Sequence, residues 1–274
     1  MGRVRTVTPF VSVQRAENPG PMTLDGTRSY VLRAPGSESS VVVDPGPDLG
    51  PHLDALAAAG PVELVLITHR HADHTAGSAG LRHRTGAPVR AMDPAHCLGA
   101  EPLRGGELIR AAGLRIEVLA TPGHTGDSVS FAVTGPTNGL TPFPETVVLT
   151  GDTVLGKGTT VIAEPDGSLG AYLESLDLLE SVAGESTTGL PAHGDPLPDL
   201  AAAVRLYRAH RIDRLEQIRK ALKHLGTDDA IPDGDLSTLT DDVVRAVYDD
   251  VDPSVLPAAR QSVLAQLRYL RGGL

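Results

Sequence analysis

The sequence predicts an α/β protein with four layers, helix, sheet, sheet and helix, followed by a small helical C-terminal domain. Short β-branched or apolar runs alternate with helical segments through the first two thirds of the 274 residues. From residue 200 onward only helical spacing is present. We therefore predict two domains, residues 1–199 and residues 200–274, which pack together because no low-complexity linker separates them.

The first strands are predicted by β-branched runs that lie between proline- and glycine-rich turns. Three such runs precede the first helix, at residues 7–13, 29–32 and 40–43. Asp48 is a suitable N-cap for a helix over residues 53–59, which Gly60 would end. A longer apolar run over residues 62–67 then predicts a buried strand.

The remaining elements follow from the same two periodicities. Further strands are predicted at residues 88–91, 114–119, 129–133, 147–149 and 188–190. Helices of the first domain are predicted at residues 75–84 and 171–182. The second domain is predicted as a long helix to about residue 225, an acidic turn at 227–235, and helices at 239–248 and 253–269.

Composition limits the class of protein. Hydrophobic residues make up 41% of the chain and charged residues 21%, which is typical of a soluble globular protein. The chain has no apolar run of the roughly 18 residues that a membrane span needs, and its N-terminus has no apolar signal core. Its one cysteine, Cys97, excludes an intrachain disulfide and a thiolate zinc site. We therefore expect a cytoplasmic protein without membrane contact.

The net charge of −10 is unevenly placed. Between Arg205 and Lys223, seven basic residues face only Asp213 and Glu216. This stretch is either a solvated helix face or a contact surface for a polyanion. The net negative charge argues against tight, sequence-independent binding of nucleic acid, because such binding needs many phosphate contacts.

The run Thr68-His69-Arg70-His71-Ala72-Asp73-His74 directly follows the apolar strand predicted at residues 62–67. Imidazole and carboxylate are ligands of zinc and similar ions, and a packed core rarely contains so many polar groups in one place. His69 and His71 lie at i and i+2 of an extended chain, so they point to the same side and can bind one ion. Three further ligand candidates lie downstream, each next to a strand end or a turn: His124, Asp152 and His193.

These seven side chains supply ligands for two divalent ions, for which zinc is expected and manganese or iron(II) are the alternatives. His124 is the third ligand predicted for the first ion. Asp73 and His74 reach a second ion, which His193 completes, and Asp152 can bridge both. Two ions about 3.5–4 Å apart hold a hydroxide at neutral pH, which attacks a carbonyl or a phosphorus. Asp73 and Asp152 are therefore also candidate catalytic residues.

The pattern His-x-His-x-Asp-His, with the downstream His, Asp and His, resembles the metallo-β-lactamase superfamily. The resemblance implies an αββα sandwich with a dinuclear metal site at one edge and the same division of ligands between two ions. It also implies that Asp44, at the end of an early strand, orients a metal ligand. A plain Asp-Pro-Gly turn is the alternative interpretation of Asp44.

Within the superfamily, the segments 18–30, 151–160 and 172–176 are similar to the lactamase-beta-like 2 group, and the resemblance covers nearly the whole chain. That group carries a C-terminal winged-helix-like domain, and its best-known member is an endoribonuclease for single-stranded RNA. Arg28 stands where the group usually has asparagine. Together with Lys157 and Thr159, it is a candidate substrate-binding residue.

Three functions follow as alternatives. The first is a metal-dependent phosphodiesterase or endoribonuclease on single-stranded RNA. The second is a hydrolase of small-molecule esters, thioesters or lactones, with chemistry like that of glyoxalase II. The third is a nucleic-acid-binding protein without enzymatic activity, in which the metal is structural. The sequence leaves the substrate, the metal identity and a homodimer open.

Overall fold

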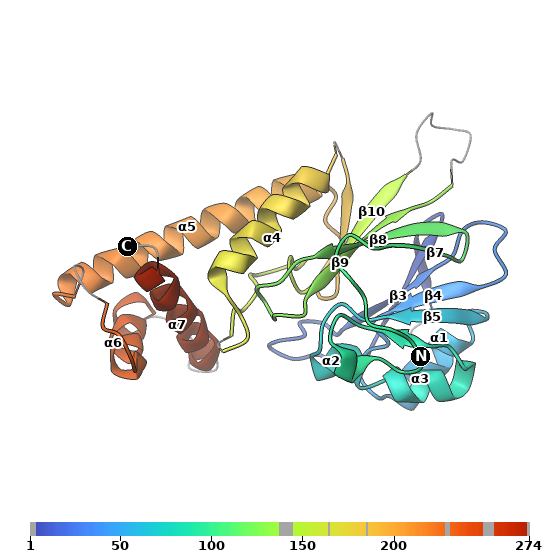
Figure 1. The fold of residues 1–274 in the computed structure, drawn as a ribbon, viewed down its shortest axis with the longest axis horizontal. Helices are drawn as coiled ribbons and strands as arrows, with labels where there is room; N and C mark the ends of the chain where they lie inside the picture. The colour runs from blue at the N-terminus through green and yellow to red at the C-terminus, as the bar shows by residue number, and fades with distance from the viewer. Residues whose placement is uncertain are drawn as a thin grey trace.

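The structure is a computed structural model that describes residues 4–136, 145–163, 165–184, 186–227, 231–248 and 255–272. Two β-sheets face each other, helices cover the outer face of each sheet, and a group of helices extends to one side (Figure 1). This arrangement confirms the predicted fold class of helix, sheet, sheet and helix with a small helical C-terminal part.

The first sheet contains six strands in the order β1-β2-β3-β4-β5-β6. Their bounds are β1 Arg5–Thr8, β2 Val11–Arg15, β3 Arg28–Leu32, β4 Ser40–Val43, β5 Val62–Leu66 and β6 Val89–Arg90. Strands β1 to β4 pair antiparallel, whereas β4, β5 and β6 pair parallel. The C-terminal ends of β4 and β5 therefore meet at one edge, where Asp44 follows β4 and His69 lies just beyond β5.

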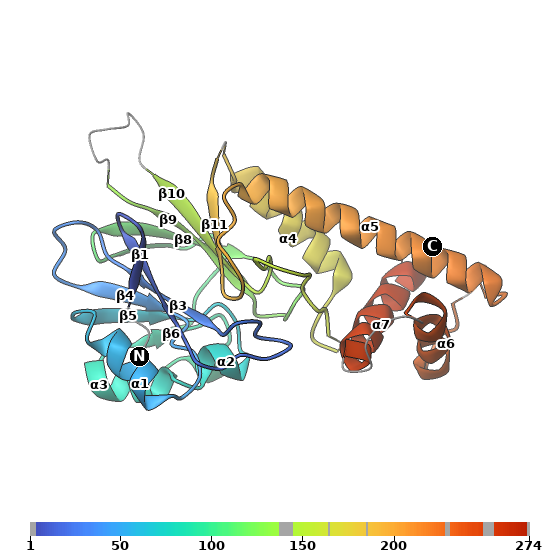
Figure 2. The ribbon, with the colours of Figure 1, turned by 180° about the vertical axis from the view of Figure 1, so that it is seen from behind.

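The second sheet contains five strands in the order β11-β10-β9-β8-β7. Their bounds are β7 Leu108–Ala111, β8 Leu114–Ala120, β9 Val129–Thr134, β10 Thr146–Gly151 and β11 Thr188–Pro191. Strands β10 and β11 pair parallel and lie side by side in both views of the ribbon (Figures 1 and 2). Their C-terminal ends carry Asp152 and His193 to a common edge.

Three apolar clusters hold the layers together. Between the sheets, side chains such as Leu32, Phe131 and Leu149 form one buried cluster. The outer face of the first sheet is covered by α1 (Gly50–Ala57) and α3 (Ser78–Thr85), whose Leu53 and Leu81 are fully buried. The second sheet is covered by α4 (Leu169–Val182) and the start of α5 (Leu200–His224). Burial of this apolar surface is the main stabilising contribution to the fold.

The C-terminal part consists of helices joined by turns and contains no strand among its described residues. Helix α5 begins directly after its N-cap Asp199, at the predicted domain boundary, which stays a prediction. Its far half carries α6 (Ser237–Val247) and α7 (Leu256–Gly272), which pack against each other and against α5 (Figure 1). The first two residues of the helix predicted at 253–269, and residues 228–230 of the predicted acidic turn, lie outside the described residues.

Several predicted elements were wrong in detail. The strand predicted at residues 7–13 is two antiparallel strands, because Pro9 lacks an N–H and Thr8 Oγ1 accepts from the N–H groups of Phe10 and Val11 in a tight turn. The helix predicted at residues 75–84 is α2 (Ala72–Thr75) followed by α3. Helix α1 starts after Leu49 with no side-chain cap, so Asp48 is not its N-cap. Strand β7 was missed.

Candidate metal centre

Loops at one edge of the sandwich bring the seven predicted ligands together. Their ligand atoms form three overlapping groups, each with all atoms within 4.8 Å of one another: His69, His71 and His124; His69, His74 and Asp152; Asp73, His74 and His193. Each side chain follows a strand or lies in the short helix α2, so a rigid sheet edge positions the whole set.

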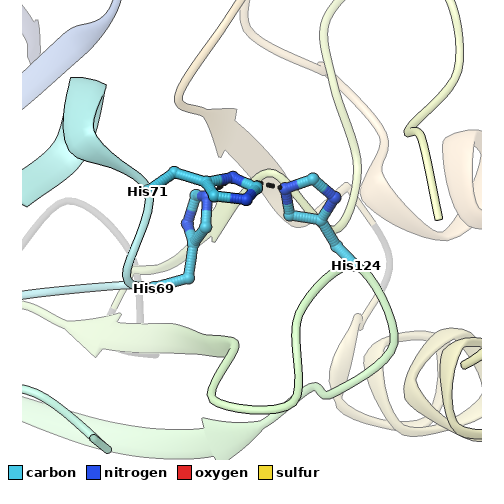
Figure 3. Close-up of side chains that lie close together, drawn as sticks. All are labelled: His69, His71 and His124. Atoms are coloured by element: carbon cyan, nitrogen blue, oxygen red, sulfur yellow. Dashed lines mark hydrogen bonds between the residues drawn. The ribbon is translucent and has the colours of Figure 1, made fainter. Parts of the chain in front are cut away.

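His69, His71 and His124 form the three-histidine group (Figure 3). His71 Nδ1 lies 3.0 Å from His69 Nε2 and 3.1 Å from His124 Nε2. Two nitrogens bound to one tetrahedral zinc ion, at about 2.0–2.1 Å each, are separated by roughly 3.3 Å. The observed spacing is close to this separation, so the three imidazoles fit a single ion.

Asp73, His74 and His193 form the mixed group. Asp73 Oδ2 lies 3.2 Å from His193 Nε2 and 3.4 Å from His74 Nε2. Asp152 lies between the two groups: its Oδ1 is 3.4 Å from His193 Nε2, and its Oδ2 is 3.8 Å from His124 Nε2. One carboxylate thus reaches toward both groups, as a bridging ligand would.

Several buried atoms at the centre have no hydrogen-bond partner: His74 Nε2, His193 Nε2 and Asp152 Oδ1. Buried polar atoms are normally paired, because leaving one unpaired costs about 1–3 kcal/mol. All three belong to the same cluster, and all are metal-ligand atoms by type. Their convergence fits a bound cation.

The contacts of Asp44 agree with the orienting role that the resemblance implies, and that role stays a prediction. It is buried, with Oδ2 2.9 Å from His74 Nδ1, which leaves His74 Nε2 facing the cluster. It also accepts hydrogen bonds from the backbone N–H and the hydroxyl of Thr68, at 2.8 and 2.7 Å. A carboxylate on the far nitrogen of an imidazole fixes its tautomer and raises its basicity as a ligand.

Sequence reasoning missed four residues that hold the ligands. The Thr68 hydroxyl lies 3.1 Å from His69 Nδ1, and the Thr27 hydroxyl donates to Asp73 Oδ2 at 3.1 Å. His124 Nδ1 lies 2.7 Å from the carbonyl oxygen of Val161, and Thr160 Oγ1 donates to the backbone oxygen of Asp152 at 2.8 Å. Only Thr68 gave a sequence signal, since it directly precedes the histidine motif.

Charge differs between the two groups. Burial lowers the pKa of His69 well below its usual range, and burial with the nearby His124 lowers that of His71 to about 4. Burial also disfavours the charged form of His193, but the Asp152 and Asp73 carboxylates that face it outweigh burial and raise its pKa to about 9. Despite its burial, His74 has a raised pKa because the Asp44 and Asp152 carboxylates face it.

The two carboxyl groups of the cluster stay ionised. Burial alone would raise the pKa of Asp73, but the nearby His193 and His74 imidazoles outweigh it and lower the pKa well below its usual range. Burial alone would also raise the pKa of Asp152, but the charges of the nearby His74 and His193 outweigh it and lower the pKa. Both side chains are therefore anions at neutral pH.

Two glycines allow the close approach that builds the site. Gly151 ends β10 with φ 51°, and a Cβ there would lie 2.9 Å from the Thr68 side chain. Gly123 has φ 134°, and its Cβ would lie 2.4 Å from the Cα of Tyr172 in α4. A side chain at either position would push apart the loops that carry Asp152 and His124.

The predicted substrate-binding residues lie near these loops but differ in setting. The Arg28 guanidinium is nearly buried and is held by Asp25 at 2.9 and 3.0 Å, with Asp195 3.8 Å away. Lys157 and Thr159 are exposed in the segment that follows Asp152. A contact of any of the three with substrate stays a prediction.

The fold and this edge define a class of protein. Residues 22–185 match the metallo-beta-lactamase superfamily, and residues 240–271 match the beta-lactamase associated winged helix domain. The chain belongs to the metallo-β-lactamase superfamily and is a hydrolase of that fold, which implies divalent metal ions at the His/Asp groups. The alternative of a binding protein without enzymatic activity is thereby set aside.

The chain is similar to known proteins over nearly its whole length. An atrochrysone carboxyl ACP thioesterase of Aspergillus chevalieri is 31% identical, covering 96% of this chain and 82% of its own length. A beta-lactamase-like protein 2 homolog of Caenorhabditis elegans is 28% identical over 92% of this chain and 81% of its own. The crystal structure of a beta-lactamase domain protein from Burkholderia ambifaria shares the fold, with a TM-score of 0.73 at 21% identity over 98% of this chain and 89% of that one.

The winged helix match covers α6 and α7. Within the part of the chain that the structure describes, no helix combines the length and apolar character needed to cross a bilayer.

Proposed function

We propose that this chain hydrolyses thioesters or related esters of small molecules at a centre of two divalent ions. His69, His71 and His124 would hold one ion, and the mixed group would hold the other, with Asp152 between them. Zinc suits this set of imidazole and carboxylate ligands, and manganese or iron(II) are alternatives. When bound, the ions would activate water as a nucleophile and polarise the substrate carbonyl.

The chain's own residues prepare this chemistry. Asp44 and the Val161 carbonyl orient His74 and His124 so that each presents Nε2 to the cluster. The ionised Asp73 and Asp152 add negative charge, which favours cations in this buried setting. Each of these roles is one of binding or orientation.

The observation that carries the choice of substrate concerns proton donors. The two carboxyls of the cluster have lowered pKa values, and His74 and His193 must lose their protons to bind an ion, so none of these four side chains would donate a proton at neutral pH once the ions are bound. A thiol has a pKa of about 8.5 and leaves as a thiolate without help from an acid. An alkoxide from RNA is a far stronger base and needs a proton. The cluster therefore favours a thioester over a phosphodiester.

Helix α5 supports the same choice. Four of its seven basic residues between Arg205 and Lys223 are used within the protein: Arg205 pairs with Glu180, Arg208 with Asp177, Arg211 contacts Thr160, and Arg214 lies over Tyr248. These contacts hold the four side chains against the protein and make them less available to bind the phosphates of a polyanion. The relative of Aspergillus chevalieri, which is named a thioesterase, agrees with this substrate class.

Single-stranded RNA is the second candidate substrate. Three basic residues at the end of α5, Arg219, Lys220 and Lys223, are exposed, and they favour a contact with phosphates. Such a contact would make cleavage fall steeply with salt concentration, whereas hydrolysis of a neutral thioester would change little.

A direct comparison of two substrates tests the proposal. Full-length protein with zinc or manganese is incubated with S-hexanoyl-N-acetylcysteamine, and released thiol is followed with a chromogenic disulfide. Fluorescent single-stranded RNA is tested in parallel, each at low and at high salt. We expect thioester cleavage that salt does not change. Asp152→Asn should remove it, as should EDTA.

The matched control is Glu101→Gln, which neutralises an exposed carboxylate that belongs to none of the three ligand groups. This variant should keep full activity. RNA cleavage that depends on Asp152, with no thioester cleavage, would replace the proposal by the nuclease alternative. Equal activity of Asp152→Asn and the native protein would refute the metal-centre assignment.

A further inference from the structure

Arg211 is a buried cation in the middle of α5. The residue is only 3% exposed, and no carboxylate of the described residues lies within ion-pair distance of its guanidinium. The preceding arginines of the helix behave differently, since Arg205 and Arg208 reach the carboxylates of Glu180 and Asp177 on α4. Burying a charge without a counter-charge is costly, so the contacts of Arg211 require a reason other than an ion pair.

Those contacts all lead toward the metal centre. Arg211 Nη2 donates to the backbone oxygen of Thr160. Its guanidinium lies over the ring of Tyr172, 5.0 Å from the ring centre. The Tyr172 hydroxyl donates in turn to the backbone oxygen of Thr153 at 2.6 Å. Arginine suits this position because a planar guanidinium can stack on an aromatic face and donate hydrogen bonds in its own plane.

The segment of residues 152–161 positions two candidate ligands: Asp152 belongs to it, and His124 is hydrogen-bonded to it. At one end, Thr160 Oγ1 donates to the backbone oxygen of Asp152 at 2.8 Å and closes the segment into a loop. At the other end, the carbonyl of Val161 binds His124 Nδ1 at 2.7 Å. Arg211 binds the carbonyl of Thr160, which precedes Val161 in the chain and carries the hydroxyl that contacts Asp152. A shift of this carbonyl would move both Asp152 and His124.

A second residue of α5 binds the same segment one helical turn earlier. The Tyr207 hydroxyl accepts from the Leu155 N–H at 2.9 Å and donates to the Leu155 carbonyl at 3.2 Å. Residues at i and i+4 share one face of a helix, so α5 presents Tyr207 and Arg211 together to the loop. The C-terminal helix therefore contacts this loop at two separate points.

We infer that Arg211 is a positioning residue of the metal centre, which acts through the Thr160 carbonyl to hold Asp152 and His124 in their places. The C-terminal domain is then a structural part of the centre, in addition to any contact it makes with substrate. This inference rests on the ligand assignment of the proposed function.

Metal binding by the full-length metal-free protein tests the inference directly. Cobalt(II) is the probe, its affinity is measured by competition with a chelator, and the geometry of its ligands is followed by its visible absorption. We expect Arg211→Met to weaken cobalt binding about 10–100-fold and to change the absorption spectrum. Arg211→Lys, which keeps a donor but loses the planar stack, should lie between Arg211→Met and the native protein.

Arg214→Met is the matched control. Arg214 lies on the same helix with its guanidinium 4.8 Å from the ring centre of Tyr248, and its contacts do not include the loop. It should lose a similar stacking contact while keeping native cobalt affinity and spectrum. Tyr207→Phe, which removes only a hydroxyl, is the second test variant if Arg211→Met does not fold, and it should weaken binding several-fold.

The outcomes separate the two proposals. Native protein that binds two cobalt ions, together with a folded Arg211→Met that binds them equally well and with the same spectrum, would overturn the inference alone. Native protein that binds no cobalt would overturn the proposed function as well. A spectrum altered equally in Arg211→Met and Arg214→Met would also overturn the inference, because the effect would then be general to α5.

Discussion

The three-histidine group and the mixed group lie side by side, but they differ in charge. His69 and His71 have lowered pKa values and are neutral at pH 7. His74 and His193 have raised pKa values, since Asp44, Asp73 and Asp152 surround them. A histidine must be neutral to bind a metal ion. His69 and His71 are therefore ready for a cation, whereas the histidines of the mixed group must first release protons.

Removing one imidazole from each group should have the largest effect. His71→Ala and His193→Ala should each reduce the bound metal from about two ions to about one, and should lower hydrolysis roughly a thousand-fold, because both ions are needed to activate water and polarise the carbonyl. Elemental analysis and steady-state kinetics measure the two quantities. Either variant with two ions and native activity would contradict the division of ligands.

The pH dependence of metal binding should differ between the groups. Because the pKa of His193 is about 9, this side chain is protonated below that pH, and binding must displace the proton. The affinity of the mixed group for a metal ion should fall about tenfold per pH unit below 9 for every proton that binding releases. The pKa of His71 is about 4 and that of His69 is lowered well below its usual range, so these two ligands should have no proton to release between pH 9 and 6.

Calorimetry of His71→Ala isolates the mixed group, and calorimetry of His193→Ala isolates the three-histidine group. Titration in buffers of different ionisation enthalpy counts the protons released in each case. Equal proton release by the two variants would remove the contrast between the groups.

Asp44→Asn should weaken the mixed group selectively. The change keeps the size of the side chain but removes the charge that faces His74 Nδ1 at 2.9 Å. A loss of about 10–100-fold in affinity for one ion is expected, with the other ion bound nearly as before. Thr27→Val, which removes a neutral donor to Asp73, serves as the comparison and should cost less. Chelator competition distinguishes the two ions.

His52 shows the effect of burial alone on an imidazole, and its expected effect is on stability and is the smallest of the set. It lies outside the cluster with Nε2 2.8 Å from the Ser29 hydroxyl, and burial lowers its pKa to about 4. As the pH falls below about 6.5, His52 takes up a proton in the unfolded chain but not in the folded one. The free energy of unfolding therefore decreases between about pH 6.5 and 4. Between pH 6.5 and 5.5 the loss should be about 1 kcal/mol, and His52→Gln should lack it. Urea unfolding at several pH values checks this, and an unchanged pH slope would contradict it.

The sequence predicted the layers and the cluster because both depend on local patterns. Period-two and helical spacing specify the elements, and ligands just beyond the ends of parallel strands must meet at one edge. The errors arose where a single residue changes the local geometry. Pro9 divides one apolar run into two strands, and a break near Gly77 separates α2 from α3.

The contacts that orient the ligands were beyond sequence reasoning for a physical reason. The Val161 carbonyl that binds His124, and the Thr160 carbonyl that binds Arg211, are backbone groups that every residue carries. Basic residues on α5 gave a pattern that fits either solvent or a polyanion. Only tertiary packing shows that Arg208 and Arg211 face α4 and the loop instead.

The order of the contacts along the chain has a consequence for biosynthesis. His69 and His71 are synthesised early, His193 comes more than a hundred residues later, and Arg211 follows still further on. A chain growing on the ribosome therefore exposes free imidazoles long before the loop at 152–161 is fixed by α5. If α5 positions this loop as inferred, metal binding becomes tight only after the C-terminal helix has packed against the loop, so the finished chain should hold its ions more tightly than its emerging N-terminal half.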